Sequence, residues 1–232
     1  MSLTAALLVA DPRVPTGAHA HSGGLEAALG DGLDPEGIPS FLRGRLASVA
    51  FTDCAIAACA ARLASAGDLV ALSRLELEAT ARVPSPPLRD ASGALGQGLV
   101  RTAARMWPGD ATLAAYRARG GPTPRPVALG VAGAAAGLAP AEVALVSLHA
   151  DLSDVAFAAV RLVAADAAQA CAWLSELAPE MERAAQVAAA HAAEAHASGD
   201  PVTLEDLPSL GAPLIELRSL IHAEREGRLF AT

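Results

Sequence analysis

Apolar residues recur at intervals of three and four along this chain, and prolines and glycines divide the pattern into helix-length pieces. The clearest example follows Pro140, where the apolar positions are Leu145, Leu148, Leu152, Val155, Ala159 and Leu162. This spacing predicts an amphipathic helix with one buried stripe. The residues expected on its opposite, solvent-facing side are Ser147, Asp151, Asp154 and Arg161.

A second stripe of the same kind lies near the end of the chain, at Leu210, Leu214, Leu217 and Ile221. Alanine, the strongest helix former, occupies 58 of the 232 positions, whereas aromatic residues make up only 3%. No segment shows the sustained alternation of β-branched or aromatic residues that is typical of strands. We therefore predict an all-α fold in which residues 1–232 form a single domain, a bundle of roughly eight to ten helices.

Proline and glycine clusters set the expected limits of these helices. They are Pro35, Pro39, Gly67, Pro84–Pro87, Pro108–Gly109, Gly120–Pro126, Pro140, Pro179, Gly199–Pro201 and Gly211–Pro213. Three further glycines, Gly130, Gly133 and Gly137, fall on roughly one face of a short helix. Because glycine in a helix costs about 1 kcal/mol relative to alanine, we expect this face to let a neighbouring backbone approach closely.

The net charge of −8 and the pI near 5.2 argue against nucleic acid and anionic membranes as partners. The most membrane-like stretch, residues 126–141, is too short and too weakly apolar to span a bilayer. The three cysteines form no CxxC pair, and the first twelve residues hold no basic region typical of a signal peptide. The sequence therefore predicts a cytoplasmic protein that has no disulfide framework and binds no membrane.

One segment departs from the acidic balance. Residues 101–125 contain a single acidic residue, Asp110, and five arginines, namely Arg101, Arg105, Arg117, Arg119 and Arg125. We interpret this segment as a solvated helical face, with docking of an acidic partner surface as the alternative.

The sequence contains no complete catalytic motif. A P-loop requires a lysine, and the chain contains none. His191, Glu194 and His196 lack the spacing that puts two histidines on one helix face, so no metal site is predicted there. Residues 20–24 resemble a nucleophile elbow around Ser22, but a turn and not a strand precedes them. We predict that the chain is not an enzyme and holds no cofactor or metal.

The segment from Asp11 to Glu26 carries the most specific pattern. Pro15 and Gly17 predict a turn between two helices, and with Gly23 as N-cap Glu26 would lie at the third helical position. The segment also resembles the N-terminal signature of the urease accessory protein family UreF. The matching positions are Asp11, Pro15, Gly17, His21, Ser22, Gly24, Leu25 and Glu26.

Three later segments extend this resemblance in the same order as in the family: residues 88–96, residues 126–138, and the end of the chain from Ser219 to Phe230. Some positions depart from the family pattern. His19 stands where an aromatic residue is common, Ala223 replaces a glutamate, and Glu226-Gly227 replaces Tyr-Ser. These departures bear on the details of partner contacts.

The resemblance implies an all-helical homodimer without enzymatic activity. Proteins of the UreF family bridge UreD (also called UreH) and the GTPase UreG, modulate its GTP cycle, and assist nickel insertion into apo-urease. Two other hypotheses stay open on the sequence alone: a helical protein-binding regulator unrelated to nickel, and a serine hydrolase using Ser22.

The resemblance also implies two sets of site residues. Those expected to shape the turn are Asp11, Pro15, Gly17 and Gly24. Those expected to contact partner proteins are His21, Ser22, Glu26, His222, Arg228, Leu229 and Phe230.

Overall fold

The computed structural model describes residues 3–197 and 204–231, with the side chains of residues 194–197 excepted. This part of the chain contains helices and no strand, which confirms the all-α prediction. The α-helices are α1 (Leu3–Ala10), α2 (Leu25–Gly30), α3 (Ile38–Leu46), α4 (Val49–Ser65), α5 (Leu69–Ala81), α6 (Pro86–Met106), α7 (Ala111–Arg119), α8 (Arg125–Ala135), α9 (Pro140–Leu162), α10 (Ala167–Ala197) and α11 (Pro213–Glu224). Short 3-10 turns are η1 (Ala18–Ala20), η2 (Pro35–Gly37) and η3 (Leu204–Asp206).

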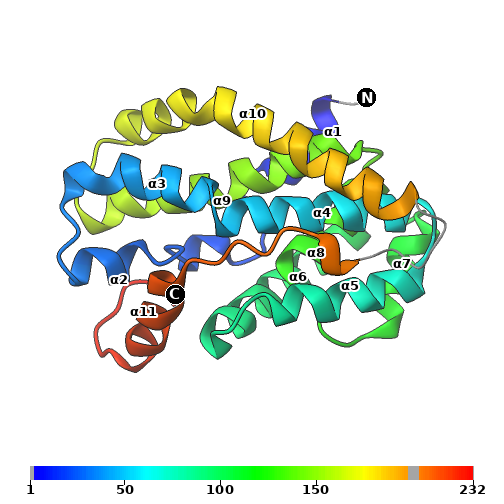
Figure 1. The fold of residues 1–232 in the computed structure, drawn as a ribbon, viewed down its shortest axis with the longest axis horizontal. Helices are drawn as coiled ribbons and strands as arrows, with labels where there is room; N and C mark the ends of the chain where they lie inside the picture. The colour runs from blue at the N-terminus through cyan, green and yellow to red at the C-terminus, as the bar shows by residue number, and fades with distance from the viewer. Residues whose placement is uncertain (1–2, 198–203, 232) are drawn as a thin grey trace.

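Helix α4 is the centre of the bundle, and α8, α9 and α10 pack along it (Figure 1). Its sequence is rich in alanine, so neighbouring backbones can approach closely. A Cβ atom added to Gly130 of α8 would overlap the Cβ of Ala60 and lie 2.5 Å from the carbonyl oxygen of Ala57. A Cβ on Gly133 would likewise overlap Val143 of α9. The expected close approach is therefore confirmed at these two glycines.

Gly137 has a different role from the one predicted. It lies beyond the end of α8, with φ of 74° and open space around it, so it terminates the helix instead of packing against a neighbour. Pro179 also differs from prediction, because α10 continues through it. Buried residues on both sides of the proline, such as Leu177 and Met181, hold the two halves against the bundle.

The polar side predicted for residues 145–162 is only partly exposed. Ser147 and Asp151 are buried, because α9 contacts α4, α10, α1, α3 and α8 and has little surface left for solvent. A buried aspartate must be paired, and Asp151 is paired with Arg45 of α3. The helix was therefore predicted correctly, but the apolar stripe did not indicate that neighbours enclose it on several sides.

The apolar stripe predicted near the chain end faces the opposite way. Its members Leu210, Leu214, Leu217 and Ile221 are 47%, 64%, 59% and 57% exposed. The inward side of α11 instead carries Ile215, Ser219 and His222. Helix α11 lies beside α2 at one end of the molecule, apart from the central layer of helices (Figure 1). The prediction that this stripe packs in the core was therefore wrong.

A strap of residues 204–212 connects the end of the bundle to α11. The Thr52 hydroxyl of α4 donates to the carbonyl oxygen of Leu210 and accepts from its N–H. Arg82 of α5 donates to the carbonyl oxygens of Leu204, Leu207 and Pro208. Side-chain donors thus fix a segment that has little regular structure of its own.

Two helical stretches, Pro35–Ser65 and Pro140–Leu162, are long and apolar enough to cross a membrane by length and composition alone. On sequence alone, residues 126–141 are the most membrane-like stretch. The most apolar windows of the two stretches are 67% and 56% buried inside the bundle, as the core helices of soluble proteins also are. Their apolar character is thus accounted for by the core they build.

Gly130→Ala should destabilise the protein by about 1–3 kcal/mol, because the new methyl group must displace the α4 backbone and this outweighs the gain in helix propensity. Gly93→Ala in α6 is the matched control, since its added Cβ meets open space. We expect the control to be neutral or stabilising by up to about 1 kcal/mol. Urea denaturation followed by circular dichroism measures both changes, and equal effects would contradict the packing argument.

Candidate functional surface

The turn after α1 is built from one ion pair and one left-handed glycine. Arg13 donates to both carboxylate oxygens of Asp11 through its side chain, and these hydrogen bonds lower the pKa of Asp11 to about 2. Gly17 has φ of 94° and precedes η1. Asp11 and Gly17 thus lie where the sequence analysis expected residues that shape the turn.

Helix α2 begins one residue later than predicted. Gly24, with φ of 89°, is the N-cap, and Glu26 is therefore the second helical residue and not the third. Ser22 is fully buried, and its Oγ accepts a hydrogen bond from the N–H of Glu26 at 3.2 Å. Added Cβ atoms at Gly23 and Gly24 would collide with Val155 of α9 and Ile215 of α11. The backbone at Gly23 and Gly24 therefore packs closely between α9 and α11.

Glu26 holds the C-terminal tail. Its carboxylate oxygens accept from the backbone N–H groups of Leu229 and Phe230, at 2.8 and 2.9 Å. The Nε2 atom of His222 lies 3.5 Å from the same carboxylate and 3.2 Å from the carbonyl oxygen of Phe230. The N–H of Ala231 donates to the carbonyl oxygen of Ala20. Residues far apart in sequence thus form one contact network, the tail clamp.

The end of the tail is covered by the chain itself. Phe230 is only 3% exposed, and the guanidinium group of Arg161 lies 4.4 Å from its ring centroid. Arg161 also donates to the carbonyl oxygen of His19, which connects α9 to the turn. Arg228 donates to the carbonyl oxygens of His222 and Ala223 and so caps the end of α11. Leu229 remains 57% exposed.

The residues expected to contact partners thus gather at one place, but most of them contact each other in this structure. Glu26, His222 and Phe230 belong to the tail clamp, and Arg228 binds the end of α11 next to it. Leu229 joins the clamp through its backbone N–H, while its side chain is exposed. The sequence analysis also considered Ser22 as a nucleophile. In the structure Ser22 is completely buried and precedes a helix with no strand before it among the described residues.

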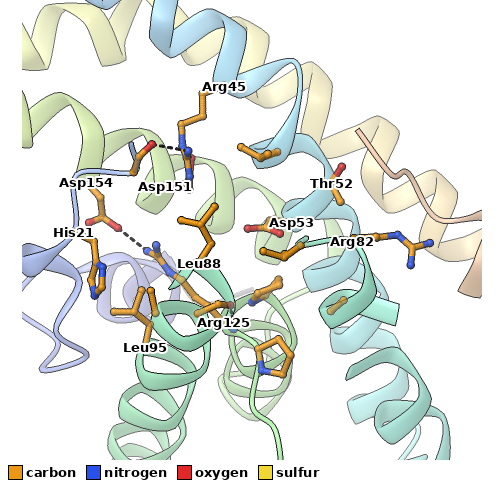
Figure 2. A pocket seen from close by; sticks show the side chains of 18 of the residues that line it. His21, Arg45, Thr52, Asp53, Arg82, Leu88, Leu95, Arg125, Asp151 and Asp154 are labelled. Atoms are coloured by element: carbon orange, nitrogen blue, oxygen red, sulfur yellow. Dashed lines mark hydrogen bonds and ion pairs between the residues drawn. The ribbon is translucent and has the colours of Figure 1, made fainter. Parts of the chain in front are cut away.

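His21 faces a second feature, a cavity of about 130 Å³ lined by charged side chains (Figure 2). Burial and the nearby positive charges of Arg125 and His19 lower the pKa of His21. Arg45 donates to both carboxylate oxygens of Asp151 and to the carbonyl oxygen of Gly23. Arg125 is paired with Asp154 at 2.7 Å. We call these paired residues and Asp53 the ionic cluster.

Asp53 of α4 is the member of this cluster for which no hydrogen bond or ion pair is found in the described chain. Burial, together with the charge of Asp151, raises its pKa to about 7. Burial alone would also raise the pKa of Asp151, but the Arg45 guanidinium holds it below its ordinary value. Burial also raises the pKa of Asp154, the third carboxylate of the cluster. The cluster therefore contains one firmly ionised carboxylate, Asp151, and one that titrates near neutral pH, Asp53.

The ionic cluster escaped the sequence analysis. Its members come from four helices, α3, α4, α8 and α9, and each alone resembles an ordinary surface charge. Asp53 gave the only local signal, since it lies inside the apolar run 49–64 where an unpaired charge is out of place. No group of three potential metal ligands is found among the described residues. The side chains of Glu194 and His196 lie outside the described part of the chain.

Comparison with known proteins adds the remaining observation. The UreF family model matches residues 33–178. Urease accessory protein UreF of Mycobacterium sp. (strain JLS) is 38% identical over 233 residues, covering 100% of this chain and 99% of the relative. The proteins of that name from Mycobacterium marinum and Mycolicibacterium vanbaalenii are 38% and 36% identical with the same coverage. The chain belongs to the UreF family.

Membership in the UreF family makes this chain a non-enzymatic urease accessory protein. The resemblance noted in the signature and tail segments is thereby confirmed, and the serine hydrolase hypothesis is rejected. The matched relatives extend over the turn and the tail as well as the family model's central part. The tail clamp and the ionic cluster are thus features of a UreF-type helical bundle.

Asp53→Asn should change how the stability of this UreF-family chain depends on pH. Asp53 ionises near pH 4 when unfolded and near pH 7 when folded, so the folded state binds an extra proton between these values. Its contribution to stability therefore falls as pH rises through this window. At pH 8 we expect Asp53→Asn to be more stable than the wild type by at least about 1 kcal/mol, a gain that disappears near pH 4. Denaturation curves across this range provide the measurement, and a pH-independent difference would count against the buried titration.

Glu26→Ala should release the tail. The variant loses two charged hydrogen bonds to backbone N–H groups, so we expect a loss of about 1–3 kcal/mol and faster amide hydrogen exchange at Leu229 and Phe230. The control is Glu36→Ala in the exposed turn η2, which should leave both amides protected. Hydrogen exchange read out by mass spectrometry distinguishes the variants. Unchanged protection in Glu26→Ala would show that the clamp does not depend on this carboxylate.

Proposed function

We propose that this chain is a scaffold in urease maturation that bridges UreD (also called UreH) and the nickel-carrying GTPase UreG. In this role it docks the assembly on apo-urease and modulates the GTP cycle of UreG while nickel is inserted. We further propose that it acts in the cytoplasm as a homodimer. Membership in the UreF family supports this role, as do the names of the matched relatives, which are urease accessory proteins.

The observation that carries the proposal is the outward apolar stripe of α11. Leu214, Leu217 and Ile221 recur at helical spacing on the exposed side, and Leu210 extends the stripe into the strap. Monomeric proteins rarely leave such a continuous apolar face in water, and where one occurs it usually marks an interaction site. An amphipathic helix with its apolar side outward is suited to fit an apolar groove of another protein. We assign this stripe, together with the exposed Leu229, to contact with UreD/UreH.

The tail clamp supports this assignment in an indirect way. Glu26 holds the tail next to the turn, His222 and Arg228 connect the tail to α11, and Gly24 leaves room for Ile215 of α11. In our proposal these residues set the position of α11, and partner binding depends on them through that position. His21 and Ser22 contribute by shaping the turn that carries Glu26. A regulator unrelated to nickel would need the same surface, but no feature of the described chain favours it.

Leu217→Glu should abolish assembly without unfolding the protein. Leu217 is 59% exposed, so its replacement should change the stability by less than about 0.5 kcal/mol. A charge in the centre of an apolar contact should weaken binding by roughly 30-fold or more. The experiment is co-purification with UreD/UreH and UreG, accompanied by circular dichroism.

The matched control is Leu77→Glu, where the leucine is 67% exposed and belongs to α5, not to the α11 stripe. We expect this variant to assemble like the wild type. Assembly of Leu217→Glu at the level of the control would contradict the assignment of the α11 stripe. Failure of the wild type to bind either protein would contradict the scaffold function itself.

A further inference from the structure

Helices α6 and α7 leave a groove where the chain turns between them, which we call the α6–α7 groove. It has a volume of about 410 Å³. Ala104 and Trp107 line it from the α6 side, and Leu113, Ala114 and Ala118 line it from α7. Trp107 is half-buried, and Ala114 and Ala118 are exposed. Part of the groove wall is therefore apolar, and the volume of the groove is sufficient for a large apolar side chain.

One arginine lines this groove, and two more lie close to one of its lining residues in the sequence of α6. Arg117 lines it directly, Arg101 lies one helical turn before Ala104, and Arg105 follows Ala104 in sequence. All three side chains are exposed, and in the described part of the chain no hydrogen bond or ion pair of these side chains is found. The acidic residue that lines the groove, Asp110, is engaged as the N-cap of α7, where it accepts from the N–H of Leu113 at 2.7 Å.

The other two arginines of this segment are accounted for. Arg119 is paired with the buried Glu76, and Arg125 with Asp154 of the ionic cluster. These two arginines are paired with carboxylates of the bundle. For Arg101, Arg105 and Arg117 no such carboxylate is found in the described chain. Residues 101–119 contain four arginines and one acidic residue, a net charge of +3 in a chain of −8. The rest of the chain carries −11, so the groove is a basic site on an acidic protein.

We propose that the α6–α7 groove docks an acidic segment of a partner protein, with one apolar side chain inserted between Trp107 and Ala114 and carboxylates paired with the three nearby arginines. Planar guanidinium groups match carboxylates in geometry, and arginine is enriched where protein interfaces are strongest. A nucleic acid fits less well, because the basic region is confined to one groove and the remaining surface would repel phosphates. This docking site lies on different helices from the α11 stripe and does not depend on the proposed role in urease maturation.

The test uses the full-length chain and a fluorescent peptide rich in glutamate with one central leucine. We expect binding measured by fluorescence anisotropy to weaken roughly tenfold in R101E/R117E, and to weaken for all proteins at high salt. The matched control is R74E/R183E, which reverses two exposed arginines on α5 and α10 for which no partner is found in the described chain. This control should bind like the wild type. Circular dichroism verifies that each variant is folded.

One further protein variant and one changed peptide test the apolar contact separately from the charges. Ala114→Trp should fill the groove and weaken binding with the charges intact, and a peptide with alanine in place of leucine should bind more weakly to the wild type. No binding of the leucine peptide by the wild type would overturn the proposal. Equal losses in R101E/R117E and R74E/R183E would overturn it as well, since general attraction would then suffice. Stronger binding of a DNA duplex, or dissociation of a dimer by R101E/R117E, would assign the groove to phosphates or to a second copy.

Discussion

The contact of α4 with α8 is the constraint on which the rest of the bundle depends. Twelve of the seventeen residues of α4 are buried, and most of them are alanines. Gly130 faces this surface so closely that even a methyl group has no space. Side chains this small contribute little burial individually, so the core gains its stability from dispersion between closely spaced backbones over a long interface. Such a core accounts for a large, almost aromatic-free protein with a single well-defined arrangement of helices.

Alanine side chains are small and alike, so they do little to define where the elements outside the core lie. The ionic cluster provides contacts that define these positions. Arg45 joins α3 to Asp151 of α9 and reaches the carbonyl oxygen of Gly23 in the turn. Removing one partner of such a buried pair costs more than the pair itself contributes, because the other charge stays buried. The position of the turn is thus coupled to the centre of the bundle. Through Glu26 the same coupling extends to the tail.

The sequence was sufficient for those features that depend on local pattern. Helical spacing and breakers predicted the fold class, and small residues at Gly130 and Gly133 predicted a close helix contact. The UreF signature located the turn, because its residues lie within sixteen positions. Features that depend on what surrounds a helix could not be obtained in this way. Asp151 occupies a polar position of α9 that the fold happens to enclose, and Pro179 lies in a helix that its neighbours hold together.

The outward stripe of α11 shows why the direction of an amphipathic helix cannot be deduced from its spacing alone. Periodicity identifies two sides, but only the neighbours decide which is buried. In α11 the inner side is held mainly by polar contacts. The hydroxyl groups of Ser219 and Ser85 form a hydrogen bond, and the Glu216 carboxylate accepts from the backbone N–H of Ser85. The Nε2 atom of His222 is within hydrogen-bond distance of the carbonyl oxygen of Phe230. Hydrogen bonds with fixed geometry thus place the helix, and its apolar residues are left unused by the fold.

This division of roles has an energetic consequence. Burying a leucine or isoleucine side chain contributes about 1.5–3 kcal/mol, and here that contribution is not spent on folding the chain. In the proposed assembly, this contribution is available to the partner that covers Leu214, Leu217 and Ile221. Because the helix is already positioned by the tail clamp, little conformational entropy needs to be lost when it is covered. The proposed scaffold role would benefit from this arrangement, since the free energy of the apolar stripe would be gained only when the assembly forms.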